Sequence, residues 1–166
     1  MMRIGLISDT HGLLRPEAVT FLRGSDLILH AGDICGPDVL EQLGQIAPVV
    51  AVRGNNDKGV WAKDLSETAL LQAGELWLYV IHDLAQLDIE PAAKGVRVVV
   101  SGHSHKPLVA ERDGVLFVNP GSAGPRRFKL PVTAAELVID GGAVSALLVD
   151  LQLAADVARV TPEPSP

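Results

Sequence analysis

Short apolar runs alternate with helical stretches in the first half of the chain, and this alternation constrains the fold more than any other feature. Runs at 3–8, 26–30 and 49–52 are predicted to form strands. Helices are predicted at 17–22 and 37–43, the second with proline in its first turn. The order strand, helix, strand, helix, strand predicts parallel pairing, because parallel neighbours need a crossover connection.

The second half of the chain is predicted to consist mainly of strands. Six apolar runs carry this prediction: 76–81, 96–101, 108–112, 115–118, 134–139 and 143–150. Asp113-Gly114 and Asp140-Gly141-Gly142 are strong hairpin signals, so antiparallel strands are expected to dominate there. The 166 residues, 48% of them hydrophobic, are enough for one sizeable core. We expect one domain over 1–160 and a disordered, proline-rich tail at 161–166.

Composition and charge argue against several classes of protein. No apolar run approaches the roughly 20 residues that cross a bilayer, which predicts a soluble protein without a membrane partner. Only five residues separate Arg3 from Asp9, too few for the apolar region of a secretory signal, so a cytoplasmic location is expected. The single cysteine, Cys35, cannot form an intramolecular disulfide, which is consistent with a reducing compartment. A formal charge of −6 without a dense basic block argues against nucleic acid as a partner.

Residues of the kinds that bind metals follow five of the predicted strands. The motifs are Asp9-x-His11, Gly32-Asp33, Gly54-Asn55-Asn56-Asp57, His82-Asp83 and Gly102-His103-Ser104-His105. In an extended chain, residues two apart project to the same side, so each of the two-ligand motifs can converge on one ion. Any one motif is compatible with an ordinary polar turn. Five such turns have no common reason to offer nitrogen and oxygen ligands, so together they predict a metal site.

In this order the five motifs resemble the calcineurin-like metallophosphoesterases, whose pattern runs D-x-H, G-D, G-N-x-D, H and G-H-x-H. The resemblance covers residues 3–122. The small size of the chain and its Asn119-Pro120-Gly121-Ser122 segment are most similar to the compact YfcE-like phosphodiesterases. The resemblance implies an α/β fold, a four-layer α/β/β/α sandwich of two mixed sheets flanked by helices, with the metals at one edge.

The resemblance also implies a ligand set for two divalent ions. The ligands of one ion would be Asp9, His11 and His105. The ligands of the other would be Asn55, His82 and His103, and Asp33 would bridge the two ions. Two carboxylates against two divalent ions leave a local charge of about +2, which attracts an anionic substrate without a basic patch. Nitrogen and oxygen ligands fit manganese, iron, zinc or nickel, and the resemblance favours manganese. His30, inside an apolar run, is expected to be structural or to support a ligand.

The implied reaction is hydrolysis of a small or activated phosphodiester, by in-line attack of a metal-bridging hydroxide. Catalytic roles are expected for Asp33, Asn55, Asp57 and His82, with Asp57 orienting a ligand or a water. Substrate contacts are expected from Asn56, Asn119, Ser122 and Arg126. For Asn119 and Ser122 an ordinary turn is an equal alternative, and Arg126 with Arg127 could either clamp a phosphate oxygen or be solvated.

Two positions depart from the family pattern. Asn56 stands where many members have a histidine that protonates the leaving group, and an amide cannot act as a general acid near neutral pH. This departure favours a diesterase that relies mainly on its metals over a general phosphatase. Asp83 stands where the family usually has glycine. Its carboxylate could crowd the metals, ligate one or point to solvent, and the sequence does not choose among these.

Three alternative functions remain open at this level. A phosphomonoesterase differs only in leaving group and charge. A scaffold with the same fold, as in the retromer subunit that resembles this family, is disfavoured because all seven candidate ligands are present. Nucleic-acid processing is disfavoured by the acidic charge. The expected partner is a small phosphoester substrate, and a homo-oligomer is left open.

Overall fold

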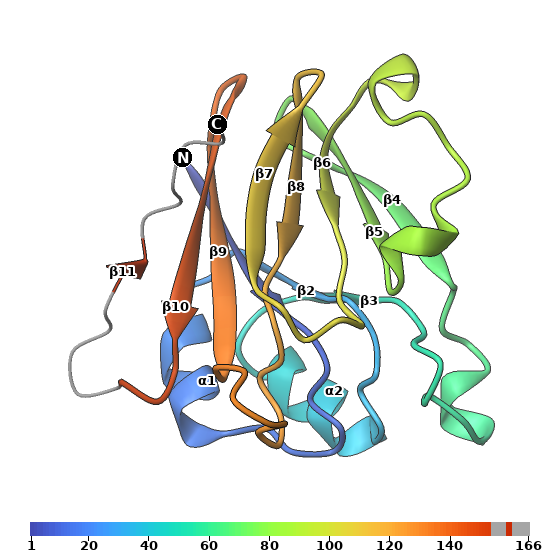
Figure 1. Cartoon of the computed structure of the whole chain (residues 1–166), viewed down its shortest axis with the longest axis vertical. Coiled ribbons are helices and arrows are strands. Elements are labelled where there is room, and N and C mark those ends of the chain that lie inside the picture. Colours follow the sequence, from blue (N-terminus) through green and yellow to red (C-terminus); the bar gives the residue numbers. More distant parts are fainter. Residues whose placement is uncertain (154–158, 161–166) are drawn as a thin grey trace.

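Two mixed β-sheets pack face to face in the computed structural model, which describes residues 1–153 and 159–160 (Figure 1). The first sheet has the strand order β11-β10-β9-β1-β2-β3, and the second has the order β4-β5-β6-β8-β7. The predicted tail at 161–166 lies outside the described residues. Within the described residues, no helix is both long and apolar enough to span a membrane.

The strands and helices have the following bounds. The first sheet contains β1 (Met2–Ile7), β2 (Leu27–His30), β3 (Val49–Ala51), β9 (Thr133–Asp140), β10 (Ala143–Asp150) and β11 (Arg159–Val160). The second sheet contains β4 (Thr68–Ala73), β5 (Leu76–Ile81), β6 (Val96–Val100), β7 (Leu108–Arg112) and β8 (Val115–Asn119). The helices are α1 (Pro16–Leu22) and α2 (Pro37–Gly44), with short 3₁₀ turns η1 (Val60–Ala62), η2 (Leu84–Gln86) and η3 (Ala92–Lys94).

The predicted parallel pairing of the first three strands is confirmed. β1 pairs in parallel with β2, and β2 pairs in parallel with β3. The helices α1 and α2 are the crossovers, and each begins with a proline, Pro16 and Pro37, whose fixed φ and missing N–H suit the first helical turn. Both helices pack on the same face of this sheet, where Leu22 and Leu43 are fully buried.

Three hydrophobic clusters separate the layers of the fold. Alternate residues of a strand face opposite sides, so Leu6 and Leu29 lie between the two sheets, whereas Ile7 and Ile28 lie under the helices. The third cluster, on the outer face of the second sheet, contains Tyr79, Ile81, Val96, Val99, Val115 and Phe117. The segment that carries η2 packs against it through Leu84, Leu87 and Ile89. The predicted four-layer sandwich is thus confirmed, with 3₁₀ turns and loop in the outer layer of the second sheet.

Two features of the second half differ from the sequence prediction. Antiparallel pairing holds for the β7–β8 and β9–β10 hairpins, but β6 pairs in parallel with both β5 and β8. The hairpin signals are local and do not report which strands become neighbours through longer connections. The edge strand β4 was also not predicted, because its pattern is weak and Leu70 is 58% exposed. Its one signal is the two-residue turn at Gly74, with φ of 59°.

The parallel core of each sheet positions the functional loops. β1, β2 and β3 run in one direction in the first sheet, and β5 and β6 run in one direction in the second. The carboxyl ends of parallel neighbours lie at the same edge of a sheet. All five motifs follow these strands, so the fold can bring them together at one end of the sandwich.

Candidate metal centre

Backbone hydrogen bonds join the motif loops in pairs. Asp9 donates its N–H to Gly32 O at 3.0 Å, and His11 donates to Asp33 O at 3.0 Å. Across the other sheet, Gly102 donates to His82 O at 2.9 Å. The first and second motifs are therefore held in register, as are the fourth and fifth.

Left-handed backbone conformations are concentrated in these loops. Positive φ values occur at five candidate ligands, Asp9 (54°), His11 (45°), Asp33 (54°), His103 (68°) and His105 (61°). Residues other than glycine adopt this conformation rarely, at a cost of roughly 1–3 kcal/mol each, and it persists only where surrounding contacts maintain it. Here the loop-to-loop hydrogen bonds maintain it, and the strained backbone directs the side chains toward the centre.

The first predicted ligand set comes together around Asp9. His105 Nε2 lies 3.2 Å from Asp9 Oδ1, and His11 Nε2 lies 3.4 Å from His105 Nε2. The other carboxylate oxygen, Oδ2, accepts from Ser8 Oγ at 2.6 Å and from His103 N–H at 3.1 Å. Oδ1 is buried and has no hydrogen-bond donor among the described residues. A buried carboxylate oxygen without a donor fits a bound cation, because such an oxygen is otherwise costly to bury.

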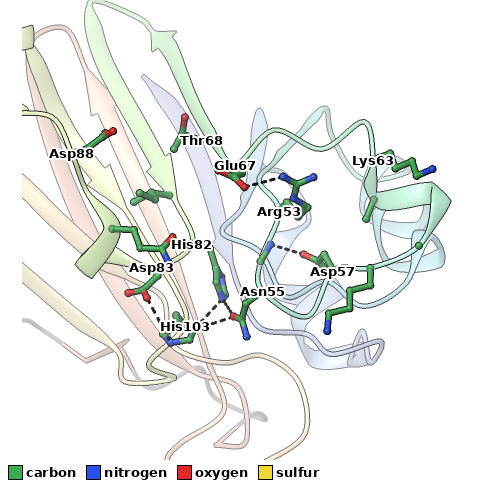
Figure 2. Close-up of a pocket in the computed structure, with 16 residues that line it drawn as sticks. Arg53, Asn55, Asp57, Lys63, Glu67, Thr68, His82, Asp83, Asp88 and His103 are labelled. Atoms are coloured by element: carbon green, nitrogen blue, oxygen red, sulfur yellow. Dashed lines mark hydrogen bonds and ion pairs between the residues drawn. The ribbon is translucent and has the colours of Figure 1, made fainter.

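The second predicted set comes together around Asn55, as Figure 2 shows. Asn55 Oδ1 lies 3.0 Å from His82 Nε2 and 3.2 Å from His103 Nδ1. The Nδ1 of His82 lies 2.7 Å from Ala31 O, which assigns the ring proton to Nδ1 and leaves Nε2 as an acceptor. Nε2 and the Asn55 oxygen are then two acceptors in contact, an arrangement that a cation between them would stabilise.

Asp33 lies between the two sets. Its Oδ1 is 3.5 Å from His82 Nε2, and its Oδ2 is 3.7 Å from His11 Nε2. Asn56 donates to both oxygens, from its backbone N–H at 2.9 Å and from Nδ2 at 2.8 Å. Burial raises the pKa of Asp33, but the contact with the His82 ring and the hydrogen bonds from Asn56 outweigh it, so the pKa lies below its ordinary value. Asp33 is thus a carboxylate at neutral pH and faces both candidate ion positions.

The protonation states of Asp9 and His11 also suit a metal site. Burial raises the pKa of Asp9, but the adjacent His105 imidazole and the hydrogen bond from Ser8 outweigh it and hold the pKa below the ordinary value. Burial lowers the pKa of His11, the Asp33 charge opposes this, and the net shift is downward. A carboxylate beside a neutral imidazole is the protonation state that metal binding requires.

Asp57 acts on the loops and not on a ligand side chain. Its Oδ1 accepts from Cys35 N–H at 2.8 Å and its Oδ2 from Gly54 N–H at 2.8 Å, so it joins the loops after β2 and β3. Glycine is required at position 54, because a Cβ there would collide with the backbone and carboxylate of Asp33. The buried Asp57 carboxylate therefore positions the backbone on either side of Asp33.

His30 is fully buried behind the first motif. Its Nδ1 accepts from Gly32 N–H at 3.1 Å, so the ring proton lies on Nε2, which donates to Thr10 Oγ1 at 3.0 Å. Thr10 in turn donates to Ile34 O at 3.1 Å. Burial lowers the pKa of His30 to about 3, so the ring is neutral in the folded protein. It supports the loops and has no direct access to a substrate.

The predicted substrate contacts divide into three cases. Asn119 Nδ2 donates to Gly102 O at 2.9 Å and Ser122 Oγ donates to Asp9 O at 3.0 Å, so both buried side chains are engaged with the motif loops themselves. Asn56 is exposed but its side chain contacts Asp33. Arg126 is exposed, and it is the next residue, Arg127, whose charge reaches the centre and adds to the lowered pKa of His11. Geometry therefore favours a positioning role for Asn119 and Ser122.

Sequence reasoning missed two contributors to the centre. Ser8 fixes one oxygen of Asp9, and Thr10 connects His30 to the backbone. Both are hydroxyl residues adjacent to Asp9 in the chain, and their fully buried position is a signal that only the fold supplies.

A cleft of about 830 Å³ opens beside the second ligand set (Figure 2). Asn55, His82 and His103 form its inner end. The charged residues of its remaining wall are Arg53, Lys58, Lys63, Glu67, Asp83 and Asp88. A volume in this range is typical of small-molecule sites.

Asp83 lies behind His103 in this cleft, as the dashed line in Figure 2 marks. Its Oδ1 accepts from Ala85 N–H at 3.0 Å and caps η2. Its Oδ2 is 3.8 Å from His103 Nε2, the ring nitrogen opposite the one that faces Asn55. The sequence left three possibilities open for Asp83, and in the structure its carboxylate faces the outer ring nitrogen of His103, a candidate ligand.

Comparison with known proteins gives matches over most of the chain. Residues 2–142 match the family described as calcineurin-like phosphoesterase superfamily domain. A probable metallophosphoesterase of Methanothermobacter thermautotrophicus is 36% identical over 160 residues, which cover 89% of this chain and 92% of that protein. The phosphodiesterase YfcE of Escherichia coli is 31% identical over 147 residues, which cover 74% of this chain and 79% of that protein.

Solved structures show the same fold. Vacuolar Protein Sorting 29 from Cryptosporidium parvum superposes with a TM-score of 0.82 and 22% sequence identity, over 96% of this chain and 95% of that chain. An archaeal phosphodiesterase superposes with a TM-score of 0.73 and 24% identity, over 89% of this chain and 99% of that chain. At these identities the likeness shows the fold alone.

Proposed function

The chain belongs to the calcineurin-like phosphoesterase superfamily, and from this premise we propose that it is a phosphodiesterase with a two-metal centre, acting on a small or activated diester. The observation that carries the proposal is the position of Asp33 between two sets of ligand atoms. Asp9, His11 and His105 would hold one divalent ion, and Asn55, His82 and His103 the other. Manganese is the proposed metal, with iron, zinc or nickel as alternatives for the same ligands.

When bound, the ions would activate water as the nucleophile and neutralise charge on the phosphoryl oxygens. The protein's own residues would supply the remaining functions. Asp33 and Asp9 are ionised, so together with two divalent ions they leave a local charge of about +2 for an anionic substrate. Asn56 is exposed beside Asp33 and offers an amide N–H for a phosphoryl oxygen. The cleft beside Asn55 and His82 would receive one ester arm.

The absence of a histidine at position 56 supports a diesterase over a monoesterase. An amide cannot protonate a leaving group, so a poor leaving group would depart slowly. A singly charged diester with a good leaving group makes the smallest demand on such a centre. Asp57, Asn119 and Ser122 would act through the loops that they bind.

We expect metal-reconstituted protein to hydrolyse bis(p-nitrophenyl) phosphate with a higher kcat/KM than p-nitrophenyl phosphate. The measurement is the initial rate of p-nitrophenol release, with bound metal quantified on the same samples. Two bound ions without hydrolysis of either compound would contradict the proposed enzyme and favour a scaffold, and no bound metal would contradict the metal centre itself.

A scaffold is the second candidate, because Vacuolar Protein Sorting 29 shares the fold. The complete set of candidate ligands favours the enzyme. We further propose a cytoplasmic protein of one domain over 1–160, without nucleic acid as a partner; nucleic-acid binding that is salt-insensitive or absent would agree with this. A homo-oligomer stays an open alternative.

Replacement of Asp83 by Asn is expected to weaken binding of one of the two ions about tenfold. A carboxylate facing the outer nitrogen of a ligating histidine orients the ring and increases its basicity, and removal of such partners costs 10–100-fold in affinity in other sites. The wider separation of 3.8 Å here places the expected effect at the lower end. The measurement is a titration of metal-free protein with Mn²⁺ in competition with a chelator.

The matched control is Asp88→Asn, which removes a carboxylate from the same cleft. Asn at position 83 retains an oxygen for the Ala85 N–H, so η2 keeps its cap. Equal Mn²⁺ affinities in wild type and Asp83→Asn would show that the carboxylate does not act through His103.

A further inference from the structure

Phe128 has a left-handed backbone conformation. Among the other described residues that are not glycine, this conformation occurs only around the candidate metal centre and in one hairpin. Eight described residues other than glycine have positive φ. Six of them lie in the motif loops, namely Asp9, His11, Asp33, Cys35, His103 and His105, and Asp113 lies in the β7–β8 turn. The eighth is Phe128, with φ of 53°. Strain of this kind clusters at binding and active sites, where contacts with other groups maintain it.

Packing within the protein does not account for the conformation of Phe128. Its side chain is 94% exposed, so burial of the ring offers no stabilisation that could offset the strained backbone. For a bulky residue, positive φ is an outlier even among loop residues. The exposed ring is therefore available to contact a ligand.

The loop that carries Phe128 is attached to the metal centre. Gly124 packs directly on the first motif, since a Cβ at this position would collide with the carbonyl oxygens of Asp9 and Thr10. Arg15 Nε donates to Gly124 O at 3.1 Å, and a β-bridge between Ser122 and Val132 closes the base of the loop. In Figure 1 the connection from β8 to β9 runs at the same end of the molecule as the loop after β6.

Basic residues flank Phe128 in the sequence. Arg126, Arg127 and Lys129 flank Phe128, and all three are exposed. The ion pairs of the described arginines are formed by other residues, so this charge is not neutralised by a described carboxylate. The base of this loop packs on the first motif, which carries two residues of the first candidate set. The cleft described above lies beside the second candidate set, away from this loop.

We propose that residues 126–129 bind the nucleoside arm of a nucleotide phosphodiester, with Phe128 stacked on the base and Arg127 on a phosphate oxygen. The proposal rests on the proposed function and narrows its substrate class. Every nucleobase has a face that stacks on an exposed aromatic ring, and base stacking of this kind is a strong contact. A guanidinium binds phosphate oxygens through paired N–H groups. A diester with two simple alkyl arms would bind the Arg127 guanidinium but would not stack on the Phe128 ring.

Two substrates with the same leaving group and the same charge test the proposal. They are p-nitrophenyl thymidine 5′-phosphate and methyl p-nitrophenyl phosphate, which differ only in the retained arm. In metal-reconstituted protein, Phe128→Ala is expected to lower kcat/KM for the nucleoside ester at least about fivefold more than for the methyl ester, mainly through KM. Arg127→Gln is expected to lower kcat/KM for both esters. Leu70→Ala, at an exposed apolar residue of β4, is the matched control and should leave the ratio of the two unchanged.

A second measurement separates failure of this proposal from failure of the proposed function. If wild-type protein hydrolyses neither ester, the phosphodiesterase is contradicted, and calorimetric titration with thymidine 5′-monophosphate still tests the loop. Weaker binding of thymidine 5′-monophosphate by Phe128→Ala than by wild type supports the proposed nucleoside site, and equal binding overturns it. Where the esters are hydrolysed, an unchanged ratio in Phe128→Ala overturns it. Phe128→Gly relieves the positive φ, so its thermal midpoint is expected at or above that of wild type, with the same loss of nucleoside preference.

Discussion

Asp33→Asn is expected to lower kcat/KM for bis(p-nitrophenyl) phosphate by about 100- to 1,000-fold, the range found when one preorganised electrostatic group is removed. The carboxylate faces both candidate ion positions, with one oxygen 3.5 Å from His82 Nε2 and the other 3.7 Å from His11 Nε2. An amide at this position presents one neutral oxygen and a donor in place of two anionic oxygens. We therefore expect the content of tightly bound metal to fall as well, which elemental analysis of the reconstituted protein measures.

The matched control for this substitution is Asp140→Asn, which makes the same chemical change at an exposed hairpin residue. The control should bind metal and hydrolyse the diester as wild type does. Thermal unfolding of both variants shows whether each is folded. Full activity and full metal content in a folded Asp33→Asn protein would contradict the bridging position of Asp33 and, with it, the two-metal arrangement.

His30→Ala is expected to lower the free energy of unfolding of the metal-free protein by about 3 to 5 kcal/mol. The substitution leaves a cavity in place of a fully buried ring, which by itself costs several kcal/mol in other cores. It also removes the acceptor of Gly32 N–H and the donor to Thr10 Oγ1, and unpaired buried polar groups add to the cost. Urea unfolding at pH 7, on protein treated with a chelator, measures the change.

The pH dependence of stability distinguishes His30 from an ordinary core residue. Its pKa in the folded protein is about 3, below the ordinary value of 6.5, so below pH 6.5 the unfolded chain binds a proton that the folded chain does not. Its contribution to stability is therefore present above pH 6.5 and is lost as the pH falls toward 3, with a slope of up to about 1.4 kcal/mol per pH unit.

Other groups of the centre modify this dependence in known directions. The lowered pKa values of Asp9 and Asp33 remove further stability at lower pH, as their carboxylates become protonated. Burial lowers the pKa of His82, but its contacts with Asp33 and Ala31 raise it above the ordinary value. Its contribution is thus present below pH 6.5 and is lost as the pH rises.

The His30→Gln variant should lose less stability than wild type between pH 6.5 and 4, and equal losses would contradict a neutral, buried His30.

The sequence by itself determined the strands that carry the motifs and the order of ligand-type residues along them. Asp9, Asp33 and Asn55 follow strands that alternate with helices, and this local pattern was enough to predict parallel pairing. Parallel strands end at the same edge of a sheet, so the meeting of these loops also followed from the sequence. The family was predicted from the same motifs, and residues 2–142 match it. The ligand roles of the individual residues stay predictions.

Only the tertiary structure decided what surrounds these residues. The sequence placed Asn119 and Ser122 among substrate contacts, whereas in the fold they bind Gly102 and Asp9 of the motif loops. It left Asp83 undecided, and the fold directs this carboxylate to His103. Each of these contacts joins segments that are distant in the chain or depends on the backbone conformation of a loop. Local preferences determine strands and turns, but side-chain partners depend on packing between elements, and the sequence pattern does not report that packing.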